Sequence, residues 1–418
     1  MELKKYKLSD IAKIEISGVD KKTKEGELPI RLCNFVDVYH NWAITNSLYD
    51  NFMCASAKEA EIAKCSIRKG QVAITKDSET RDDIGIATYI ADDFTDVLLG
   101  YHCASITPNE NFLDGKYLNA FMHTSYIQKY FENNASGSGQ RYTLSNDTIS
   151  NIPILLPSLE KQHKIGAILS NIDRKIELNK AINDNLEAMA KQLYDYWFVQ
   201  FDFPNEEGKP YKSSGGEMVY NERLKREIPK GWEILHLADC LSCKTERVDK
   251  SEIQKTDFYT PIEVIPRKQM SLNETVPIEE AVSGICRYKK GNILLSNRRV
   301  YFHKVCIAPF DGLTRDTVIV LEPIRKELLA YYYETVFSEK FIAYATKHSY
   351  GSEQPVLSWS AAQKFEILKP TNQLDYKFST VVDNIIETVL NNHKEIGQLN
   401  KLRDELLPLL MNGQLTIA

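Results

Sequence analysis

The residue types that most often carry chemistry are scattered along this chain. Cys240 and Cys243 form a single CxxC pair, whereas a structural zinc ion needs four ligands. Histidines such as His102, His163 and His303 are far apart in the sequence, so structural roles are expected for them. No GxxxxGK, GxGxxG or HExxH motif is present, and no Asn/Asp-Pro-Pro-aromatic motif that would hold an adenine for methylation. We therefore predict a non-catalytic chain that binds no metal and no cofactor itself.

The strongest pattern is an apolar seam between Lys164 and Trp197, repeated near the C-terminus. Its steps alternate between four and three residues, a period typical of a helix packed lengthwise against another helix. About 33 residues at ~1.5 Å each make a rod of roughly 50 Å. The predicted seam positions are Ile165, Leu169, Ile172, Ile176, Asn179, Leu186, Leu193 and Trp197, and then Phe378, Val382, Ile385, Val389, Asn392, Leu399, Leu406 and Leu410.

The two seams belong to a longer internal repeat. The offset between them is constant along their length, and the same offset relates short segments that precede each seam. Farther upstream the offset is larger, so loop lengths differ inside the repeated unit. The aligned segments are 144–145 with 357–358, Pro157 with Pro370, and 69–72 with 290–293. The chain is therefore predicted to be two copies of a globular domain followed by a long helix.

Composition sets the outer limits of this prediction. The chain has 418 residues, 43% of them hydrophobic, which is enough for two to four domains. No apolar run is long enough to span a membrane and the N-terminus lacks an apolar signal core, so we expect a cytoplasmic protein. Eight cysteines without a framework are typical of reduced thiols. The formal net charge of −5 means that any affinity for DNA must come from local basic patches or a basic partner.

Strand and helix signals are mixed without strict βαβ alternation, which favours a mixed α/β chain with two globular α+β domains and two long antiparallel helices. A strand is predicted over 30–38, and helices over 55–63, 116–131 and 328–345. Asn179 and Asn392 are expected to face each other and set the helix register. Pairing of the helices between two chains is the alternative. The predicted boundaries are 1–157 for the first domain, 158–203 for the central helix, 204–370 for the second domain with a linker at 204–230, and 371–418 for the C-terminal helix.

One junction between domain and helix resembles a known family. Gly137-Ser-Gly-Gln-Arg-Tyr-Thr-Leu-Ser145, Ile152-Pro-Ile-Leu-Leu-Pro157 and Leu159-Glu-Lys-Gln162 resemble the junction motif of the specificity subunits of type I restriction–modification systems. The aromatic stretch 194–204 and the linker after it also resemble the central region of that family. The second junction departs from the motif, because Lys369 replaces the Leu before Pro370. The helical pattern after this junction is intact. The departure therefore weakens the match to the local motif more than it weakens the predicted architecture.

The resemblance implies a function for the repeat. Each globular domain would be a target-recognition domain for one half of a split double-stranded DNA sequence, and the helix pair would fix the unread spacer. Two adenine methyltransferase subunits would dock on the chain and bind S-adenosylmethionine, and a restriction and translocation subunit would use ATP and Mg²⁺. The aromatic run at 194–203 would then serve either the core or that docking surface.

The resemblance also directs attention to loops that follow strands, because such loops present side chains on a stable scaffold. Arg, Lys, Asn and Gln suit base edges, whereas hydroxyl groups suit phosphates. The alternative is that these residues are solvated loop residues or caps. The candidate DNA contacts are Lys76, Ser78, Thr80 and Arg81 in one loop, Gln140, Arg141 and Tyr142 in a Gly/Ser loop, and Arg298, Arg299, Tyr301, His303, Lys304 and Gln354 in the second copy.

Two other classes of function are considered. A two-domain scaffold that binds proteins through a coiled coil would show the same repeat. A self-contained restriction or methylation enzyme is disfavoured by the missing motifs. A split DNA target whose halves follow the two domains independently would discriminate the first interpretation from both.

Overall fold

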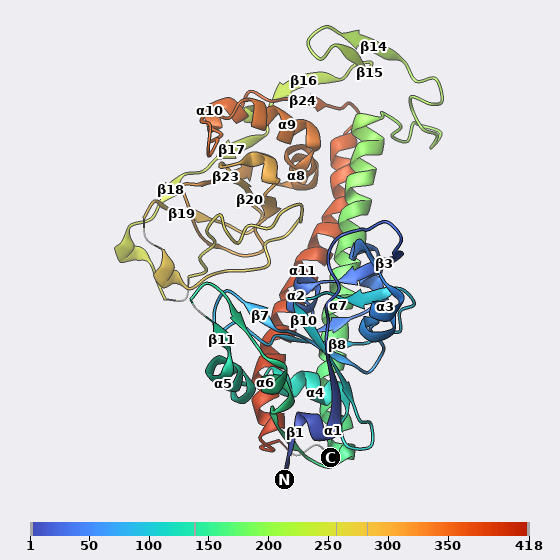
Figure 1. Cartoon of the computed structure of the whole chain (residues 1–418). Helices are drawn as coiled ribbons and strands as arrows, with labels where there is room; N and C mark the ends of the chain where they lie inside the picture. The colour runs from blue at the N-terminus through green and yellow to red at the C-terminus, as the bar shows by residue number, and fades with distance from the viewer. Residues whose placement is uncertain (1–2, 138, 256, 282, 416–418) are drawn as a thin grey trace. The chain divides into compact units, whose positions relative to one another are not determined.

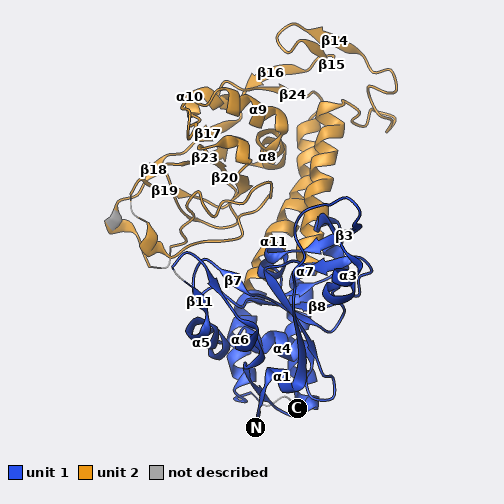
Figure 2. Ribbon diagram, in the orientation of Figure 1, with its two compact units in different colours: residues 1–177, 399–418 blue, residues 178–398 orange. Residues whose placement is uncertain are grey.

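The computed structural model describes residues 3–415 except 138, 256 and 282. It divides into two compact units (Figure 2), a first unit of residues 1–177 with 399–418 and a second unit of residues 178–398. The long helices α7 (Leu159–Tyr194) and α11 (Leu374–Met411) each contribute to both units. Ser138, which belongs to the first junction motif, lies outside the described residues.

The first unit is built on a five-stranded sheet whose strand order is β2-β10-β6-β8-β4. Adjacent strands in this sheet are antiparallel, except β4 and β8, which are parallel. Three smaller sheets accompany it, with orders β5-β3-β9, β11-β12-β7 and β1-β13. The strands are β1 (Lys4–Lys7), β2 (Ala12–Ile16), β3 (Leu28–Cys33), β4 (Ala43–Ile44), β5 (Met53–Ala57), β6 (Val72–Thr75), β7 (Asp77–Ser78), β8 (Ala87–Ile90), β9 (Val97–Leu99), β10 (Cys103–Pro108), β11 (Ser136–Gly137), β12 (Tyr142–Thr143) and β13 (Pro153–Leu156).

Helices of the first unit cover this sheet and bury its core. Ile74 and Ile106 of the sheet cluster with Tyr117, Phe131 and Ile165 from three helices. The helices are α1 (Leu8–Ile11), α2 (Phe35–His40), α3 (Glu59–Cys65), α4 (Gly115–Met122), α5 (Ser125–Asn134) and α6 (Asn146–Ser150), with the first part of α7.

The second unit repeats the plan with a four-stranded sheet ordered β17-β23-β20-β21. A β18-β19-β22 sheet and the pair β16-β24 accompany it, and the hairpin β14-β15 lies in the predicted linker. The elements are β14 (Met218–Asn221), β15 (Arg226–Pro229), β16 (Glu233–His236), β17 (Leu241–Cys243), β18 (Glu246–Arg247), β19 (Ile285–Tyr288), β20 (Ile293–Ser296), β21 (Val305–Ile307), β22 (Gly312–Arg315), β23 (Val318–Pro323), β24 (Glu366–Lys369), α8 (Leu329–Phe337), α9 (Glu339–Lys347) and α10 (Trp359–Ala362).

The predicted repeat is visible in individual hydrogen bonds. Before β6, the side chain of Gln71 accepts from the amide of Arg68, and before β20 Asn292 accepts in the same way from Lys289. The glycine of each turn has positive φ, +93° at Gly70 and +84° at Gly291. The hydroxyls of Tyr117 and Tyr331 donate to the carbonyls of Leu155 and Leu368, two positions that the repeat aligns. The prediction of two α+β copies in a mixed α/β chain is confirmed.

The two long helices pack against each other in antiparallel fashion, as Figure 1 shows. In the first unit Ile165 and Leu169 of α7 cluster with Leu410 of α11, whereas in the second unit Ala190 clusters with Phe378. Every predicted seam position is buried or half-buried, so the 3.5-residue period marks a real packing face. The half-buried positions are Ile172, Leu186, Leu193, Trp197, Ile385, Asn392, Leu399 and Leu406.

The expected pairing of Asn179 with Asn392 is wrong. Nδ2 of Asn392 donates to Oδ1 of Asn183 at 2.8 Å, while Nδ2 of Asn179 donates to Glu395 Oε2 at 2.8 Å. The repeat aligns Asn392 with Asn179 along the sequence. In an antiparallel pair, however, the position at which the helices cross decides which residues face each other. Residues that the internal repeat aligns in the sequence are therefore not necessarily neighbours in space.

The aromatic run after α7 belongs mainly to the core of the second unit. Phe198 packs against Tyr331 and Phe378, and the ring of Phe203 stacks between Trp232 and Tyr211. Tyr196 is the exception, because its side chain is exposed. The prediction that this aromatic run packs in the core is thus confirmed for its buried residues.

Several predictions of local secondary structure are wrong where the chain changes direction. The helix expected over 55–63 begins only at Glu59, after β5. The strand expected over 30–38 ends at Cys33, where Asn34 caps α2. The helices expected over 116–131 and 328–345 are each two helices, because Thr124 and Ser338 act as new N-caps. Their hydroxyls accept from amides three residues later, which starts a helix in a new direction.

Candidate nucleic-acid interface

The two candidate loops of the first unit lie together. Strand β7 pairs with β12, with Asp77 opposite Thr143 and Ser78 opposite Tyr142. The amide of Leu144 also donates to the carbonyl of Lys76 at 2.7 Å. We call residues 76–78 with 141–144 the first platform. It brings the loop after β6 beside the Gly/Ser loop, which the sequence did not place together.

The centre of the first platform is a carboxylate surrounded by three nitrogen-bearing side chains. Oδ2 of Asp77 lies 2.6 Å from His102 Nδ1, 3.1 Å from Lys76 Nζ and 3.4 Å from Arg141 Nη2. Burial raises the pKa of Asp77, but hydrogen bonds from His102, Thr143 and Lys76 outweigh burial and hold that pKa below its usual value. Asp77 was not among the predicted residues, because an acid is not an obvious ligand for DNA.

One nitrogen in this cluster has two close neighbours. His102 Nδ1 is 2.6 Å from the carboxylate and also 2.7 Å from Nη2 of Arg141. Arginine nitrogens only donate, and a ring nitrogen that donates to Asp77 has no lone pair for a second donor. We assign the hydrogen bond to Asp77 and treat the arginine approach as a contact. Arg141 is therefore oriented by the carboxylate.

The remaining candidates of the first unit surround this cluster. The guanidinium carbon of Arg81 lies 5.1 Å from the centroid of the Tyr142 ring, a cation–π distance. Thr80, Arg81, Gln140 and Arg141 are exposed, whereas Ser78 and Tyr142 are half-buried. The side chain of Lys76 is only 18% exposed. Lys76 is thus the least accessible cation of the set.

The second unit contains an equivalent platform, residues 297–299 with 354–357. The amide of Leu357 donates to the carbonyl of Asn297 at 2.8 Å, and Arg298 bridges to Val356. These contacts match those of Leu144 with Lys76 and of Thr143 with Asp77, at positions that the two offsets of the repeat align. Nη1 of Arg298 donates to Oε1 of Gln354 at 2.9 Å. The structure thus brings together two predicted residues that are 56 positions apart.

Beside the second platform is a cavity of about 440 Å³, which we call the basic cavity. Arg267 lies 4.1 Å above the ring of Phe302, and the Nε atoms of Arg299 and Arg315 have no hydrogen-bond partner among the described residues. In the part of the lining that the structure describes, one acid accompanies five cations. The charged residues are Glu263, Arg267, Arg298, Arg299, Lys304 and Arg315. Such a site favours an anionic or acceptor-rich ligand, as DNA is.

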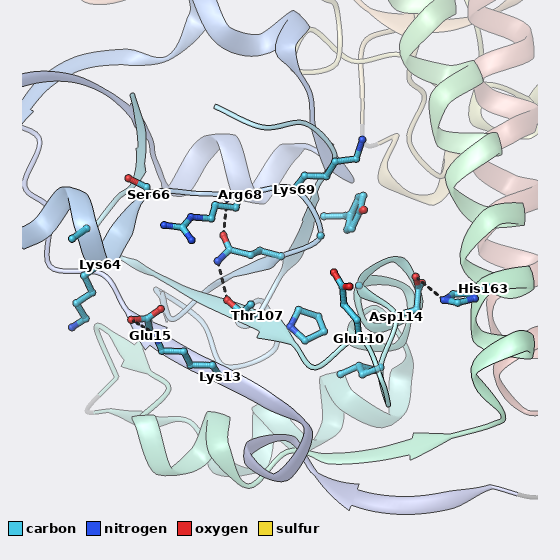
Figure 3. Close-up of a pocket in the computed structure, with 17 residues that line it drawn as sticks. Lys13, Glu15, Lys64, Ser66, Arg68, Lys69, Thr107, Glu110, Asp114 and His163 are labelled. Atoms are coloured by element: carbon cyan, nitrogen blue, oxygen red, sulfur yellow. Dashed lines mark hydrogen bonds and ion pairs between the residues drawn. The ribbon is translucent and has the colours of Figure 1, made fainter. Parts of the chain in front are cut away.

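A cavity of about 500 Å³ in the first unit contrasts with the basic cavity (Figure 3). Its lining contains both cations and acids, and Gln71 accepts from the amide of Arg68 while donating to Thr107 at 2.8 Å. Figure 3 also shows Asp114 directed toward His163, with 3.8 Å between Oδ2 and Nε2. None of the candidate residues lines this cavity. Its mixed charge does not favour a polyanion.

Comparison with known proteins identifies the family. The family model described as "Type I restriction modification DNA specificity domain" matches residues 1–188 and 229–401. This chain belongs to that family. It is 28% identical over 384 residues to the MjaIX specificity subunit of Methanocaldococcus jannaschii, covering 86% of this chain and 81% of the relative. It is 25% identical to the HindI specificity subunit of Haemophilus influenzae over 84% and 88% of the two chains.

The fold of this family member also matches a solved structure. The S subunit of the type I system of M. genitalium superposes with a TM-score of 0.57 at 15% identity, covering 98% of this chain and 96% of that one. At this identity the likeness concerns the fold alone. It agrees with the repeated α+β plan and the two long helices.

Two predicted contacts of this specificity-family chain bind main-chain carbonyl groups: His303 is buried, and Lys304 is half-buried and lines the basic cavity. His303 is 3% exposed, and its Nε2 donates to the carbonyl of Phe337 at 2.8 Å. Burial lowers the pKa of His303, so the ring is neutral at pH 7. Lys304 donates to the carbonyls of Ile262 and Glu263 at 2.6 and 2.9 Å. Both side chains hold the loop in place, whereas Tyr301 remains 48% exposed.

Sequence inspection missed Arg267 and Arg315. Neither follows a predicted strand in the aligned position, and the segment that contains Arg267 is a long irregular connection between β18 and β19. A cation–π partner such as Phe302, which lies well beyond that connection, cannot be inferred from local spacing. Only the folding of the connection back onto the sheet brings Arg267 to the cavity, where Arg315 lies at the end of β22.

The structure contains few other candidates for chemistry. Among the described residues there is no group of three or more His, Cys, Asp or Glu that could hold a metal ion. Cys240 is buried and burial raises its pKa to about 12, which leaves it a protonated thiol. Within the described part of the chain, no helix is long and apolar enough to cross a bilayer.

Proposed function

We propose that this chain is the non-catalytic DNA-recognition subunit of a type I restriction–modification complex, and that each globular domain recognises one half of a bipartite target. The observation that carries the proposal is the duplicated platform. The same backbone contacts hold both platforms, yet their side chains differ: Asp77 and Arg141 in one, Arg298 and Gln354 in the other. A common frame with different side chains suits two domains that recognise different sequences.

The helix pair is proposed to set the length of DNA between the half-sites. Helices α7 and α11 are continuous over 36 and 38 residues, and their seam is apolar apart from a few polar contacts such as Asn183 with Asn392. A continuous, packed helix pair resists bending better than a loop. DNA advances by about 3.4 Å per base pair, so a stiff connection selects a spacer of whole base pairs.

An exposed stripe along α7 and the π-helical turn that follows it, Asp195–Val199, supports docking of methyltransferase subunits. Leu178, Ile182, Met189 and Tyr196 recur at steps of four, seven and seven residues, and all are exposed. This period continues the coiled-coil repeat on a face outside the α7–α11 seam. A row of exposed apolar side chains on a regular helix fits a partner helix. We propose two such partners, which would bind S-adenosylmethionine and methylate adenine.

Restriction is proposed to reside in a further subunit that uses ATP and Mg²⁺ for translocation and cleavage. The chain itself would then bind double-stranded DNA and its protein partners and carry no cofactor. A protein-binding scaffold with the same helices is the alternative, and it predicts no sequence dependence on DNA.

The test is the set of adenines methylated in a genome when this chain is produced with its methyltransferase. We expect a split motif with a constant spacer. Replacing residues 1–157 with the corresponding domain of another family member should change one half-site only. Arg325→Ala, which removes an exposed arginine paired with Glu327, serves as a control and should leave the motif unchanged. A continuous motif, or methylation without sequence preference, would refute the proposal.

A further inference from the structure

In each platform an arginine and its hydrogen-bond acceptor occupy the same two positions. The order of the two residues along the chain is opposite in the two platforms. In the first platform, Asp77 stands in the segment after β6 and Arg141 in the Gly/Ser loop. In the second platform the corresponding residues are Arg298 and Gln354. The equivalence follows from backbone contacts, because Asp77 pairs with Thr143 as Arg298 pairs with Val356. At this pair of positions each unit therefore presents one arginine that contacts an acceptor side chain across the junction.

Both arginines are accessible and are held from one side. The side chain of Arg141 is 60% exposed, and Arg298 is also exposed. Nη2 of Arg141 is 3.4 Å from Asp77, and Nη1 of Arg298 is 2.9 Å from Gln354. A guanidinium has five N–H donors in a rigid plane, so one acceptor fixes that plane and leaves other donors for a ligand.

Building on the proposed function, we propose that Arg141 and Arg298 each recognise the guanine of one G·C pair, one in each half-site. Guanine presents O6 and N7 as two neighbouring acceptors in the major groove, which match two parallel N–H groups of an oriented guanidinium. Asp77 and Gln354 are the positioning residues that hold each arginine in the required plane.

A base contact explains the held arginines better than a phosphate contact does. An oriented guanidinium can also bind a phosphate through two parallel N–H groups, so the charge around each arginine has to decide between the two ligands. The carboxylate of Asp77 beside Arg141 would also repel a phosphate, whereas it does not prevent contact with the neutral guanine edge. In the second unit, Arg267, Arg299 and Arg315 of the basic cavity provide separate cations for the DNA backbone.

The decisive variants both remove the guanidinium fork, and the charge is kept in one and lost in the other. Arg298→Lys and Arg298→Ala are produced in the full chain with its methyltransferase, alongside Arg325→Ala as the matched surface control. Selection from randomised duplexes measures the preference at every position of both half-sites. Both Arg298 variants should lower discrimination at one G·C pair of the second half-site by about 5- to 150-fold, the loss typical of one bidentate base contact. Arg141→Lys and Arg141→Ala should do the same in the first half-site.

Two further measurements separate base recognition from charge. The dependence of binding on salt should be unchanged in Arg298→Lys, because the number of cations is the same. Gln354→Glu keeps the acceptor and should retain the preference for that pair, whereas Gln354→Leu should weaken it. Thermal melting of each variant, compared with the parent chain, verifies folding.

Several results would overturn the inference. Wild-type discrimination in Arg298→Ala would mean that Arg298 contacts no base edge, and relaxation at an A·T pair would mean a different base. Equal loss in both half-sites would contradict the assignment of one arginine to each unit. A wild-type complex with no split motif refutes the proposed function itself. A split motif that the variants leave unchanged refutes this inference alone.

Discussion

At the scale of single residues, the two units hold buried acids in opposite ways. Asp77 of the first unit is stabilised as a carboxylate by hydrogen bonds from surrounding donors, so its pKa lies below the usual value. Glu334 of the second unit is 2% exposed, and burial, with repulsion from Asp195 and Glu187, raises its pKa to about 8. Because linkage ties each shift to stability, these two residues should make stability contributions with opposite dependence on pH.

Asp77→Asn should weaken the first platform. At pH 7 the loss of charge-assisted bonds should lower the free energy of opening at residues 76–78 and 142–144 by about 1–3 kcal/mol. A depressed pKa means that the wild-type carboxylate contributes stability above its unfolded pKa and loses it as the pH falls through the folded pKa. The difference between variant and wild type should therefore shrink below about pH 4. Amide hydrogen exchange measures this free energy of opening. A difference between variant and wild type that does not depend on pH would contradict this account.

Glu334→Gln should have the reverse dependence. A raised pKa favours folding while the acid is protonated, and that stability is lost as the pH rises through about 8. The variant should match the wild type near pH 4, below the unfolded-state pKa of Glu, and be more stable at pH 9 by on the order of a few kcal/mol. Urea unfolding followed by tryptophan fluorescence is suitable, since Trp197, Trp232 and Trp359 all lie in the second unit. Equal stabilities at pH 9 would show that Glu334 ionises without penalty.

At the scale of elements, the helix pair depends on a few polar contacts within an apolar seam. Asn183 is buried, and its oxygen accepts from Asn392, whereas its own Nδ2 has no partner among the described residues. A polar pair in such a seam costs stability but disfavours shifted registers, because a shift would leave both amides unpaired. Register is the property on which a constant spacer depends.

A double-mutant cycle tests this contact. Asn392→Leu should destabilise the second unit by about 1–3 kcal/mol, because it leaves the buried oxygen of Asn183 without a donor. Adding Asn183→Leu should recover that loss, since two leucines pack well in a coiled-coil seam. Urea unfolding supplies the four free energies. Additive losses in the double variant would show that the two amides do not interact.

At the scale of the whole molecule, each long helix contributes to both compact units. Both helices cross from one unit to the other near their middle, at residues 177–178 in α7 and 398–399 in α11. Because the chain passes from unit to unit only through helical segments, the proposed spacer length is encoded in helix length rather than in a flexible linker.

Inserting one heptad into both helices at these crossing points tests the spacer. Seven residues preserve the 3.5-residue seam and add about 10 Å. This corresponds to about three base pairs of unread DNA, while both half-sites stay the same. Methylome sequencing of the complex gives spacer and half-sites together. An insertion into α7 alone is the control and should destabilise the pair, and an unchanged spacer with intact methylation would refute the role of the helices.

Sequence by itself determined the repeat, the two long helices and the family. A helix shows its buried face in the sequence because neighbouring residues on that face recur every three or four positions, as Leu169, Ile172 and Ile176 do. The two junction segments, 144–145 and 357–358, were likewise recognisable because short hydrogen-bonded turns depend mainly on local residue types. These features required no knowledge of distant contacts.

Tertiary structure alone decided which side chains meet. Asn392 lies against Asn183 and not Asn179 because facing residues depend on where two antiparallel helices cross. His303 is buried and Arg267 joins the basic cavity because loops fold back over the sheets, and loop paths leave no periodic signal. The opposite order of Arg141–Asp77 and Arg298–Gln354 became visible only when backbone contacts aligned the two platforms. Local patterns report the face of an element, whereas contacts between distant residues depend on how the whole chain packs.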